Sequence, residues 1–553
     1  MSARSFTRLQ ITRRRKLPET EEPASYLLIG FGVALLLILF AGGFQHLVAQ
    51  QKTARPQKLP SAQKIVDDYL KAVGGKKRLA LIRDATYEWT IQLNDQPMGT
   101  ARTQIKSPGS LRSEMTFGNG QIISAASMRS AWVHGLDGQL RTLTGAEGTT
   151  AKLQALLDAS HLVELKKLNV LARPISVGDL ASEPAYIVEF SMRNGARLRY
   201  WFSVSSKLLL KIEDNERKTT TRLKEYRPQG TSEGVLEPHR VSLSTGPSGE
   251  LAFLLQRASY NTGIVDSTFD PPGADQTLDI RTLLREVGSN QDEVERRVSE
   301  YAFVQKETDQ EITGKGEIKK EKVKVFEIFP IPNSEPIKKL ISENGVPLSP
   351  ERAAKETKRV EEEFLKAERD RDQKEQKVER RREEQRRKYE AEGKTQDEDP
   401  DLSQFLRICE FVSSRRERFR DRDAVVFDFR ARPGFKPSNR EESLISKVVG
   451  VVWIDPHDKQ IMRLEARLAE NFNVAGGLFS LRPGASFAIE QTRMAEGVWL
   501  PRLAQVNLST KILFFGGGDM NKIIEWSDYK HFKGDVGDYK LDAPKAVETD
   551  KKP

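Results

Sequence analysis

The sequence is poor in the residues from which most catalytic and metal sites are built. Its single cysteine, Cys409, has no partner in the chain for a disulfide and excludes a zinc site made of cysteines. The six histidines never occur at the His-x-His or His-x-x-x-His spacing of metal ligands. No Gly-x-Ser-x-Gly elbow occurs, and Gly516-Gly517-Gly518-Asp519 lacks the Lys-Ser/Thr of a phosphate loop, which favours a hairpin turn. We therefore predict a protein that is not an enzyme and has neither metal nor cofactor.

The charge of the chain is positive but carries no nucleic-acid motif. The formal net charge is +10, from 89 Lys and Arg against 79 Asp and Glu. Residues 349–400 are almost wholly charged or Gln, with both signs mixed and no sustained apolar stripe, which argues against a coiled coil. We predict a solvent-exposed, charged helical insertion there and no nucleic-acid partner.

The N-terminal region has the pattern of a membrane-directed segment. Residues 26–44 contain no charged side chain, and a helix of this length spans roughly 28 Å, close to a hydrocarbon core. The basic run Arg13-Arg14-Arg15-Lys16 precedes it and favours an N-terminus that stays inside. We predict a cytoplasmic basic tail (1–25), a transmembrane anchor or signal peptide (26–48) and a linker (49–60).

Two alternatives follow for the location of the protein. A retained anchor places it in the inner membrane as a single-pass protein with its bulk in the periplasm. Cleavage after Ala49 as a signal peptide would instead secrete it to the periplasm.

Most of the remaining chain alternates between apolar and polar residues, with turn residues at short intervals, as antiparallel strands do. Helices are expected at residues 61–82, with Ser61 as N-cap, at 149–160 and at 279–298. These patterns predict a first β domain (61–275), a second β domain (276–533) and a charged tail (534–553).

The two β regions share a set of motifs with identical internal spacing. Trp201, Lys207 and Glu213 lie six residues apart in turn, and so do Trp453, Lys459 and Glu465. Each region also contains a Glu-Gly-Val segment with a proline five residues after the glutamate. This proline is Pro238 in the first region and Pro501 in the second. The pattern indicates a duplicated fold with insertions confined to loops. Glu213 and Glu465 are explained by cross-strand ion pairing at least as well as by acid–base chemistry.

The first β region resembles a known family. The segments that carry the likeness are residues 65–75 (Ile-Val-Asp-Asp-Tyr-Leu-Lys-Ala-Val-Gly-Gly), 234–241 and 260–271. Over residues 61–275 the chain resembles the LolA/LolB-like periplasmic lipoprotein carriers and the acidobacterial outer-membrane lipoprotein-sorting type of protein. The second region, about 290–533, is similar to another acidobacterial family of the same β type.

The resemblance implies a curved antiparallel sheet, an incomplete barrel covered by helices, whose apolar inside holds acyl chains. We therefore expect an α+β, mainly antiparallel β fold with two tandem curved sheets (incomplete half-barrels), covering helices and an N-terminal transmembrane helix. The candidate cavity residues lie on one face of paired strands in each copy: Tyr186, Val188, Phe190, Leu210, Ile212, Val425, Phe427, Phe429, Met462 and Leu464. The alternative is an ordinary filled β core at the same positions.

These observations predict a membrane-tethered, non-catalytic, extracytoplasmic binding protein for a lipid, lipoprotein or other amphipathic ligand. The membrane itself is the first expected partner, through residues 26–48, and other envelope proteins are possible partners. One alternative is a cell-envelope scaffold with filled cores. Another is a hydrolase whose site is assembled across loops.

Overall fold

The structure is a computed structural model. It describes residues 59–228, 234–244, 249–272, 277–290, 297–298, 300–313, 318–331, 336–369, 380, 400–474, 479–494, 497–512 and 518–531. The basic tail, the 26–48 segment and the charged tail therefore lie outside the described residues. In the described part, none of the helices combines the length and the apolar character that crossing a bilayer requires.

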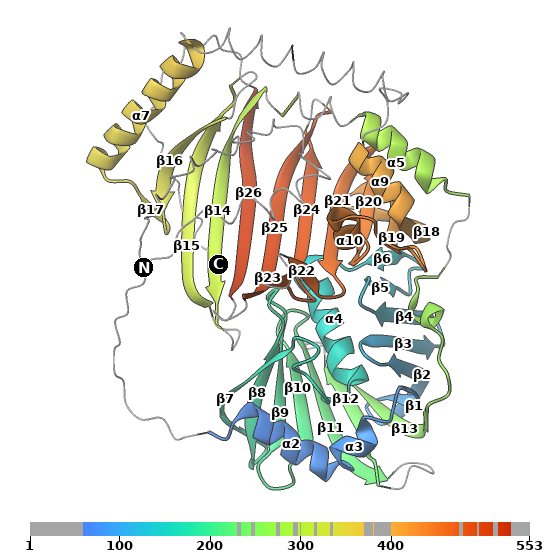
Figure 1. Cartoon of the computed structure of the whole chain (residues 1–553). Coiled ribbons are helices and arrows are strands. Elements are labelled where there is room, and N and C mark those ends of the chain that lie inside the picture. Colours follow the sequence, from blue (N-terminus) through green and yellow to red (C-terminus); the bar gives the residue numbers. More distant parts are fainter. Residues whose placement is uncertain are drawn as a thin grey trace, which may run out of the picture. The chain divides into compact units, whose positions relative to one another are not determined.

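The first sheet is open and entirely antiparallel. Its strands follow the order β6-β5-β4-β3-β2-β1-β13-β12-β11-β10-β9-β8-β7 (Figure 1). They are β1 (Asp84–Leu93), β2 (Gln96–Lys106), β3 (Ser110–Phe117), β4 (Gly120–Ala126), β5 (Ala131–His134), β6 (Leu140–Thr142), β7 (Leu171–Leu180), β8 (Glu183–Ser191), β9 (Arg197–Ser203), β10 (Leu209–Asp214), β11 (Thr219–Pro228), β12 (Leu236–Ser244) and β13 (Glu250–Tyr260).

Helices cover one face of this sheet. They are α2 (Ala62–Ala72), α3 (Lys76–Leu79) and α4 (Gly145–Ala159), and a short 3-10 turn, η1 (Asp266–Phe269), follows β13. Ser61 caps α2 as expected, its hydroxyl accepting from the Lys64 backbone N–H. The expected helix at 61–82 is interrupted at Gly74 and Gly75, which both have positive φ.

The first sheet curls around α4. This helix contacts β2, β3, β4 and β5 on one side and β9 on the other. In a flat sheet, β2 and β9 would lie six strand spacings apart, about 29 Å, whereas a helix is only about 10–12 Å across. The sheet must therefore bend so that α4 lies on its concave side.

The second sheet is also open and antiparallel, in the order β17-β16-β15-β14-β26-β25-β24-β21-β20-β19-β18, with β22 and β23 beside it. Its strands are β14 (Tyr301–Ile312), β15 (Ile318–Phe329), β16 (Ile337–Glu343), β17 (Val346–Pro347), β18 (Cys409–Phe419), β19 (Arg422–Ala431), β20 (Val448–Asp455), β21 (Gln460–Leu468), β22 (Phe472–Val474), β23 (Phe479–Leu481), β24 (Ser486–Arg493), β25 (Trp499–Ile512) and β26 (Asp519–His531).

The two sheets have one topology, which confirms the duplication inferred from the motifs. Strands β1–β4 and β7–β13 of the first order match β14–β17, β18–β21 and β24–β26 of the second, position by position. Trp201 lies opposite Ile187 and Lys211, and Trp453 lies opposite the corresponding Val426 and Arg463.

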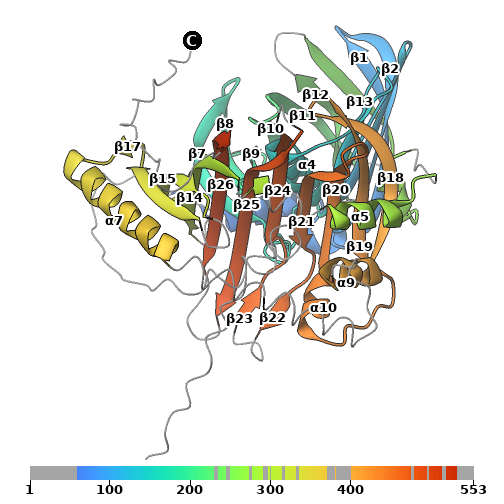
Figure 2. The same cartoon turned by 90° about the horizontal axis from the view of Figure 1, so that it is seen from above.

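The covering helices are duplicated as well. The second sheet has α5 (Ile280–Ser289), α7 (Pro350–Arg369), α9 (Pro400–Ile408) and α10 (Arg440–Ile445). Helix α5 precedes its sheet as α2 does, and α9 precedes β18 as α4 precedes β7. Figure 2 shows α5, α9 and α10 gathered beside β18–β20.

Helix α7, the described start of the charged insertion, is not exposed on all sides. Its Val360 and Phe364 are buried against Phe329, Ile331 and Ile337 at one end of the second sheet. Leu365 remains exposed. Polar contacts with β16 add to this packing: Glu356 accepts from the Leu340 backbone N–H, and Arg352 pairs with Glu343. The structure thus fixes the beginning of the insertion to the edge of the second sheet.

A buried polar cluster joins the two sheets, which lie in one compact unit. Arg415 of β18 binds Glu417 (Nε–Oε1, 2.6 Å) and Asp428 (Nη1–Oδ1, 3.0 Å). From the first sheet, Thr142 donates to Glu417 (2.6 Å) and Ser130 to Asp428 (2.7 Å). All five residues are buried. Each carboxylate therefore has a partner in both sheets, as buried charges require.

Candidate functional site

The first three candidate residues lie on the concave side of the first sheet, as expected, and belong to its core. Val188 and Phe190 are completely buried, and Tyr186 packs against them from a half-buried position. The Phe190 ring contacts the Tyr200 ring edge-on, with centroids 5.0 Å apart. Side chains from α2 and α4, including Leu70 and Leu153, fill the space between these residues. The interior described here is occupied by protein side chains.

A bulge changes the position of one candidate in each copy. In the first sheet, Leu209 pairs with Phe202 and Lys211 with Trp201, so Leu210 is an extra residue. In the second, Ile461 and Arg463 pair with consecutive residues of β20, and Met462 is the extra one. A bulge breaks the two-residue alternation of side chains.

Because of the bulge, the strict alternation assumed from the sequence does not hold at these two positions. Ile212 packs against the interior core of the first sheet, whereas Leu210 is half-buried outside that cluster. Met462 packs with Trp453, and Leu464 lies opposite Val452 and Ile489.

The remaining candidates of the second sheet are covered by a helix. Val425, Phe427 and Phe429 are buried. Phe405 of α9 lies edge-on to Phe429 (5.2 Å between centroids), and Phe411 lies edge-on to Phe427 (5.4 Å). The opposite face of the same strands carries Arg415 and Asp428, which bind the first sheet. This part of the second sheet is thus packed on both faces.

Five aromatic residues at the border of the first core form a group that we call the aromatic end: Tyr69, Tyr87, Trp89, Tyr226 and Tyr260. Tyr87 is buried, and the other four are partly exposed and pack against the core. The Tyr87 ring lies 6.1 Å from the Trp89 ring and 6.4 Å from the Tyr260 ring, centroid to centroid. An apolar surface with polar edges of this kind suits an amphipathic ligand.

A carboxyl group sits within the aromatic end. Glu237 of β12 accepts hydrogen bonds from the hydroxyls of Tyr87 (3.1 Å) and Tyr260 (2.7 Å). Burial raises the pKa of Glu237, although both hydrogen bonds favour its charged form. The sequence analysis missed Glu237, because its two partners lie 150 and 23 residues away in the chain.

A second carboxyl group faces the interior from α4. Burial raises the pKa of Asp158 to about 6, against the opposing effects of Gln154 and Arg217. With Glu237, it makes the polar part of the interior acidic. An anionic group would therefore be unfavourable beside these two carboxyl groups, whereas a neutral or apolar group would not.

The repeated glutamates are structural. Glu213 pairs with Lys211 (2.8 Å) and accepts from the Trp201 indole (3.1 Å), and Glu465 pairs with Arg463 (2.7 Å). The ion pairs run along one strand, two residues apart, instead of across strands as expected. In the second copy Glu465 also accepts from the backbone N–H of Gly145 at the start of α4.

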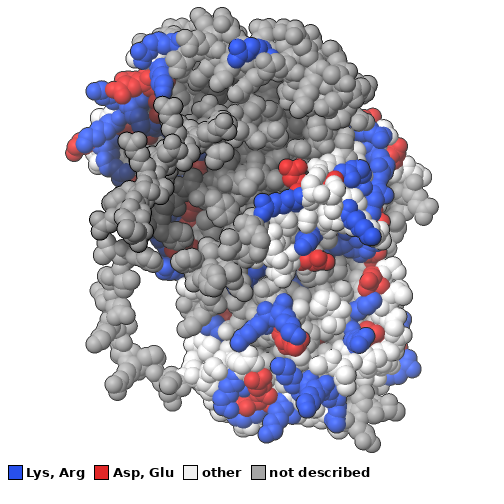
Figure 3. All heavy atoms as spheres, in the orientation of Figure 1, with Lys and Arg blue, Asp and Glu red and all other residues white. Residues whose placement is uncertain are grey.

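Within the described ranges, no three His, Cys, Asp or Glu side chains form a group that could hold a metal ion. Burial raises the pKa of Cys409 to about 12, which keeps its thiol protonated. On the described part of the face in Figure 3, Lys and Arg are interspersed with Asp and Glu.

Comparisons with known proteins give structural matches. No family model matches the chain, and no curated protein does. A LolA superfamily protein from Nitrosomonas europaea is 15% identical, with a TM-score of 0.27, covering 38% of this chain and 99% of its own. A lipoprotein-sorting protein domain from Vibrio parahaemolyticus is 12% identical, with a TM-score of 0.26, covering 38% and 97%.

A longer match spans both sheets. The MucA/MucB complex structure of Pseudomonas aeruginosa is 8% identical with a TM-score of 0.17, and the match covers 84% of this chain and 94% of that one. These solved structures include the kind of protein that the sequence resemblance named. The likeness concerns the fold alone.

Proposed function

We propose that the protein is a non-catalytic binding protein of the cell envelope that holds the acyl part of a lipid or lipoprotein inside the first curled sheet, an incomplete half-barrel. In this proposal residues 26–48 tether it to the inner membrane and the sheets lie in the periplasm. The second sheet acts as a scaffold.

The observation that carries the proposal is the way the first interior is closed. Its apolar concave face is covered by short helices, and the aromatic end stays partly exposed beside them. Helix α2 holds its place through Ile65, Val66, Leu70 and a contact of Tyr69 with Phe202 (5.3 Å between centroids). An acyl chain that enters the interior must displace these side chains, and its own apolar contacts would then replace theirs. Helix α2 is therefore the element that must move to admit the chain.

The acidic groups inside define which part of the ligand enters. Asp158 and Glu237 repel an anionic head group, whereas an acyl chain carries no charge. The head group should therefore remain outside the interior, in solvent beyond the partly exposed aromatic residues.

Quenching by a bromine-labelled fatty acid tests the proposal, because bromine quenches tryptophan fluorescence only at close range. Of the tryptophans, Trp89 lies at the aromatic end, whereas Trp453 is buried in the second sheet. We expect quenching in the full-length protein that Trp89→Phe removes and Trp453→Phe leaves intact.

Two results would count against the proposal. A fatty acid that does not quench at all indicates that the interior stays filled. Quenching that survives Trp89→Phe places the acyl chain elsewhere. Either result would favour the scaffold alternative if the ligand-free protein also captured envelope proteins. The observation that supports this alternative is the second sheet, which is packed on both faces.

A further inference from the structure

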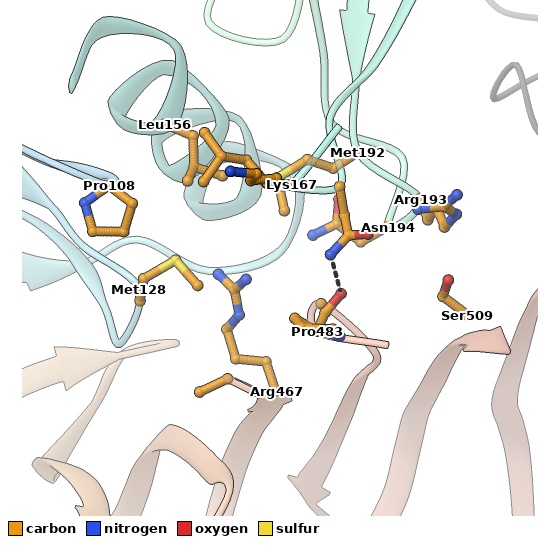
Figure 4. Close-up of a pocket in the computed structure, with 14 residues that line it drawn as sticks. Pro108, Met128, Leu156, Lys167, Met192, Arg193, Asn194, Arg467, Pro483 and Ser509 are labelled. Carbon is orange, nitrogen blue, oxygen red and sulfur yellow. Dashed lines mark hydrogen bonds between the residues drawn. The ribbon is translucent and has the colours of Figure 1, made fainter. Parts of the chain in front are cut away.

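A pocket lies between the two sheets, beside helix α4 (Figure 4). Its volume is about 170 Å³. Leu156 of α4, Met128 and Met192 form apolar walls from the first sheet, and Arg467 of β21 and Ser509 of β25 line it from the second. Figure 4 shows the Arg467 side chain rising from its strand between Met128 and Pro483 toward α4.

Arg467 has no counterion among the residues that the structure describes. Among the described residues, none accepts a hydrogen bond from its guanidinium or forms an ion pair with it, and its Nε is fully buried. Loss of hydration lowers the pKa of Arg467 to about 10. An unpaired charge in a partly buried position is costly. A charge that lacks a protein partner there usually has another one, such as a bound ion or ligand.

Two other cations that line the pocket already have a carboxylate partner. Arg193 pairs with Asp519 (2.5 Å) and Lys167 with Glu164 (2.8 Å). Lys152, whose charge acts on the same region, donates to the carbonyl of Arg129 and adds further positive potential. The uncompensated charge of the pocket is therefore positive.

Ser509 is a second, independent sign of a missing partner. Its side chain is only 3% exposed, and its hydroxyl makes no hydrogen bond to any described residue. A buried hydroxyl without a partner loses the hydrogen bonds that it makes in water. Both unsatisfied groups line the same pocket.

The size of the pocket limits what it can hold. A dry cavity of roughly 150 Å³ accommodates a benzene molecule. The pocket is of that order, which is too small for an acyl chain but sufficient for an anionic group with a short apolar part.

We propose that this pocket binds an oxyanion, a carboxylate or a phosphate, bearing a short apolar group, with the Arg467 guanidinium as its counterion. A guanidinium offers two parallel N–H donors to either oxyanion. The Ser509 hydroxyl supplies a further donor on the pocket wall, and Met128, Leu156 and Met192 contact the apolar part. This site shares Leu156 and Met192 with the core of the first sheet but has no residue in common with the aromatic end, and the proposal does not rest on acyl binding.

Calorimetric titration of the full-length protein with inorganic phosphate and with sodium butanoate tests the site. We expect Arg467→Met, which removes the charge and keeps much of the volume, to weaken binding about tenfold or more. Ser509→Ala should weaken it less. Arg222→Met, on β11 of the first sheet, is the matched control and should leave binding unchanged.

The thermal stability of the unliganded variants separates a binding role from a structural one. Arg467→Met removes an unpaired charge, so its melting temperature should equal or exceed that of the wild type. A lower melting temperature, with unchanged anion binding, would mean that Arg467 serves the fold and would overturn the proposal.

Vesicles distinguish the source of the oxyanion. Arg467-dependent binding of free phosphate or butanoate indicates a small soluble anion. Arg467-dependent binding only to vesicles of phosphatidylglycerol, and not of phosphatidylcholine, indicates a lipid head group. Binding that is absent from all of these probes, or equal in wild type and Arg467→Met, would overturn the proposal.

Discussion

Phe190 and Phe429 occupy equivalent positions in the two copies, and both side chains are buried among aromatic neighbours. Truncating either to alanine should cost about 3–5 kcal/mol in the free energy of unfolding, because the cavity left behind refills only partly. Urea denaturation of each variant measures this cost. Ile175→Ala, at an exposed position of β7, is the control and should change stability by less than about 0.5 kcal/mol. A small loss at Phe190 alone would reveal a first interior that is already open.

The buried carboxyl of Asp158 should make stability depend on pH. Burial raises its pKa in the folded protein to about 6, above the ordinary value of 3.8 for an aspartate. The folded state therefore binds the proton more tightly than the unfolded state does, and the stabilisation is complete below the lower of these values. It is lost as the pH rises through about 6.

Asp158→Asn should remove this dependence. The difference in unfolding free energy between the variant and the wild type should grow in favour of the variant from pH 4 to pH 7.5, in roughly the range set by the two pKa values. Denaturation at several pH values measures it. A constant difference would show that Asp158 is well solvated in the folded protein.

At the level of the elements, strand β18 is held by the buried polar cluster around Arg415, which we call the Arg415 cluster. Arg415→Ala leaves Glu417 and Asp428 buried without their common cation, and breaking such a pair costs about 3–5 kcal/mol. We expect a loss of that size in thermal or urea unfolding. Arg418→Ala, on the same strand but exposed, should cost less than about 0.5 kcal/mol. Equal effects of the two variants would contradict the burial of the cluster.

That the two sheets share one topology could be predicted from the sequence, because Trp201 and Trp453 begin motifs of equal spacing, and they occupy equivalent strands. The shared bulge could not, since Leu210 and Met462 read as ordinary apolar strand residues. The contact between Ser130 and Asp428 joins positions 298 residues apart, and no local pattern reports it. The same holds for Glu237 and Arg467, whose surroundings come from distant strands.

For the whole chain, tethering through residues 26–48 stays a proposal with a direct test. The uncharged stretch follows a basic cluster, so the N-terminus should remain in the cytoplasm. A reporter enzyme that folds only outside the cytoplasm, fused after Pro60, should be active, and inactivity would reverse the orientation. Sequencing the N-terminus of the mature protein distinguishes the alternatives, because a start at Gln50 would indicate a cleaved signal.

The two sheets should unfold together, because the groups that join them are buried in both. Thr142 and Ser130 supply the contribution of the first sheet to the Arg415 cluster. Thr142→Val with Ser130→Ala removes those two hydroxyls, including the oxygen that accepts from Arg415. It leaves Arg415 paired within the second sheet and the Thr142 backbone N–H bonded to Glu417. Each lost partner of a buried acceptor costs roughly 1–3 kcal/mol, and that cost falls on the contact between the sheets.

Calorimetry of the wild type should therefore show one transition, and the double variant should show two. Thr100→Val, at an exposed position of β2, should keep the single transition. A wild type that already unfolds in two steps would mean that the cluster orients the sheets without coupling their stability.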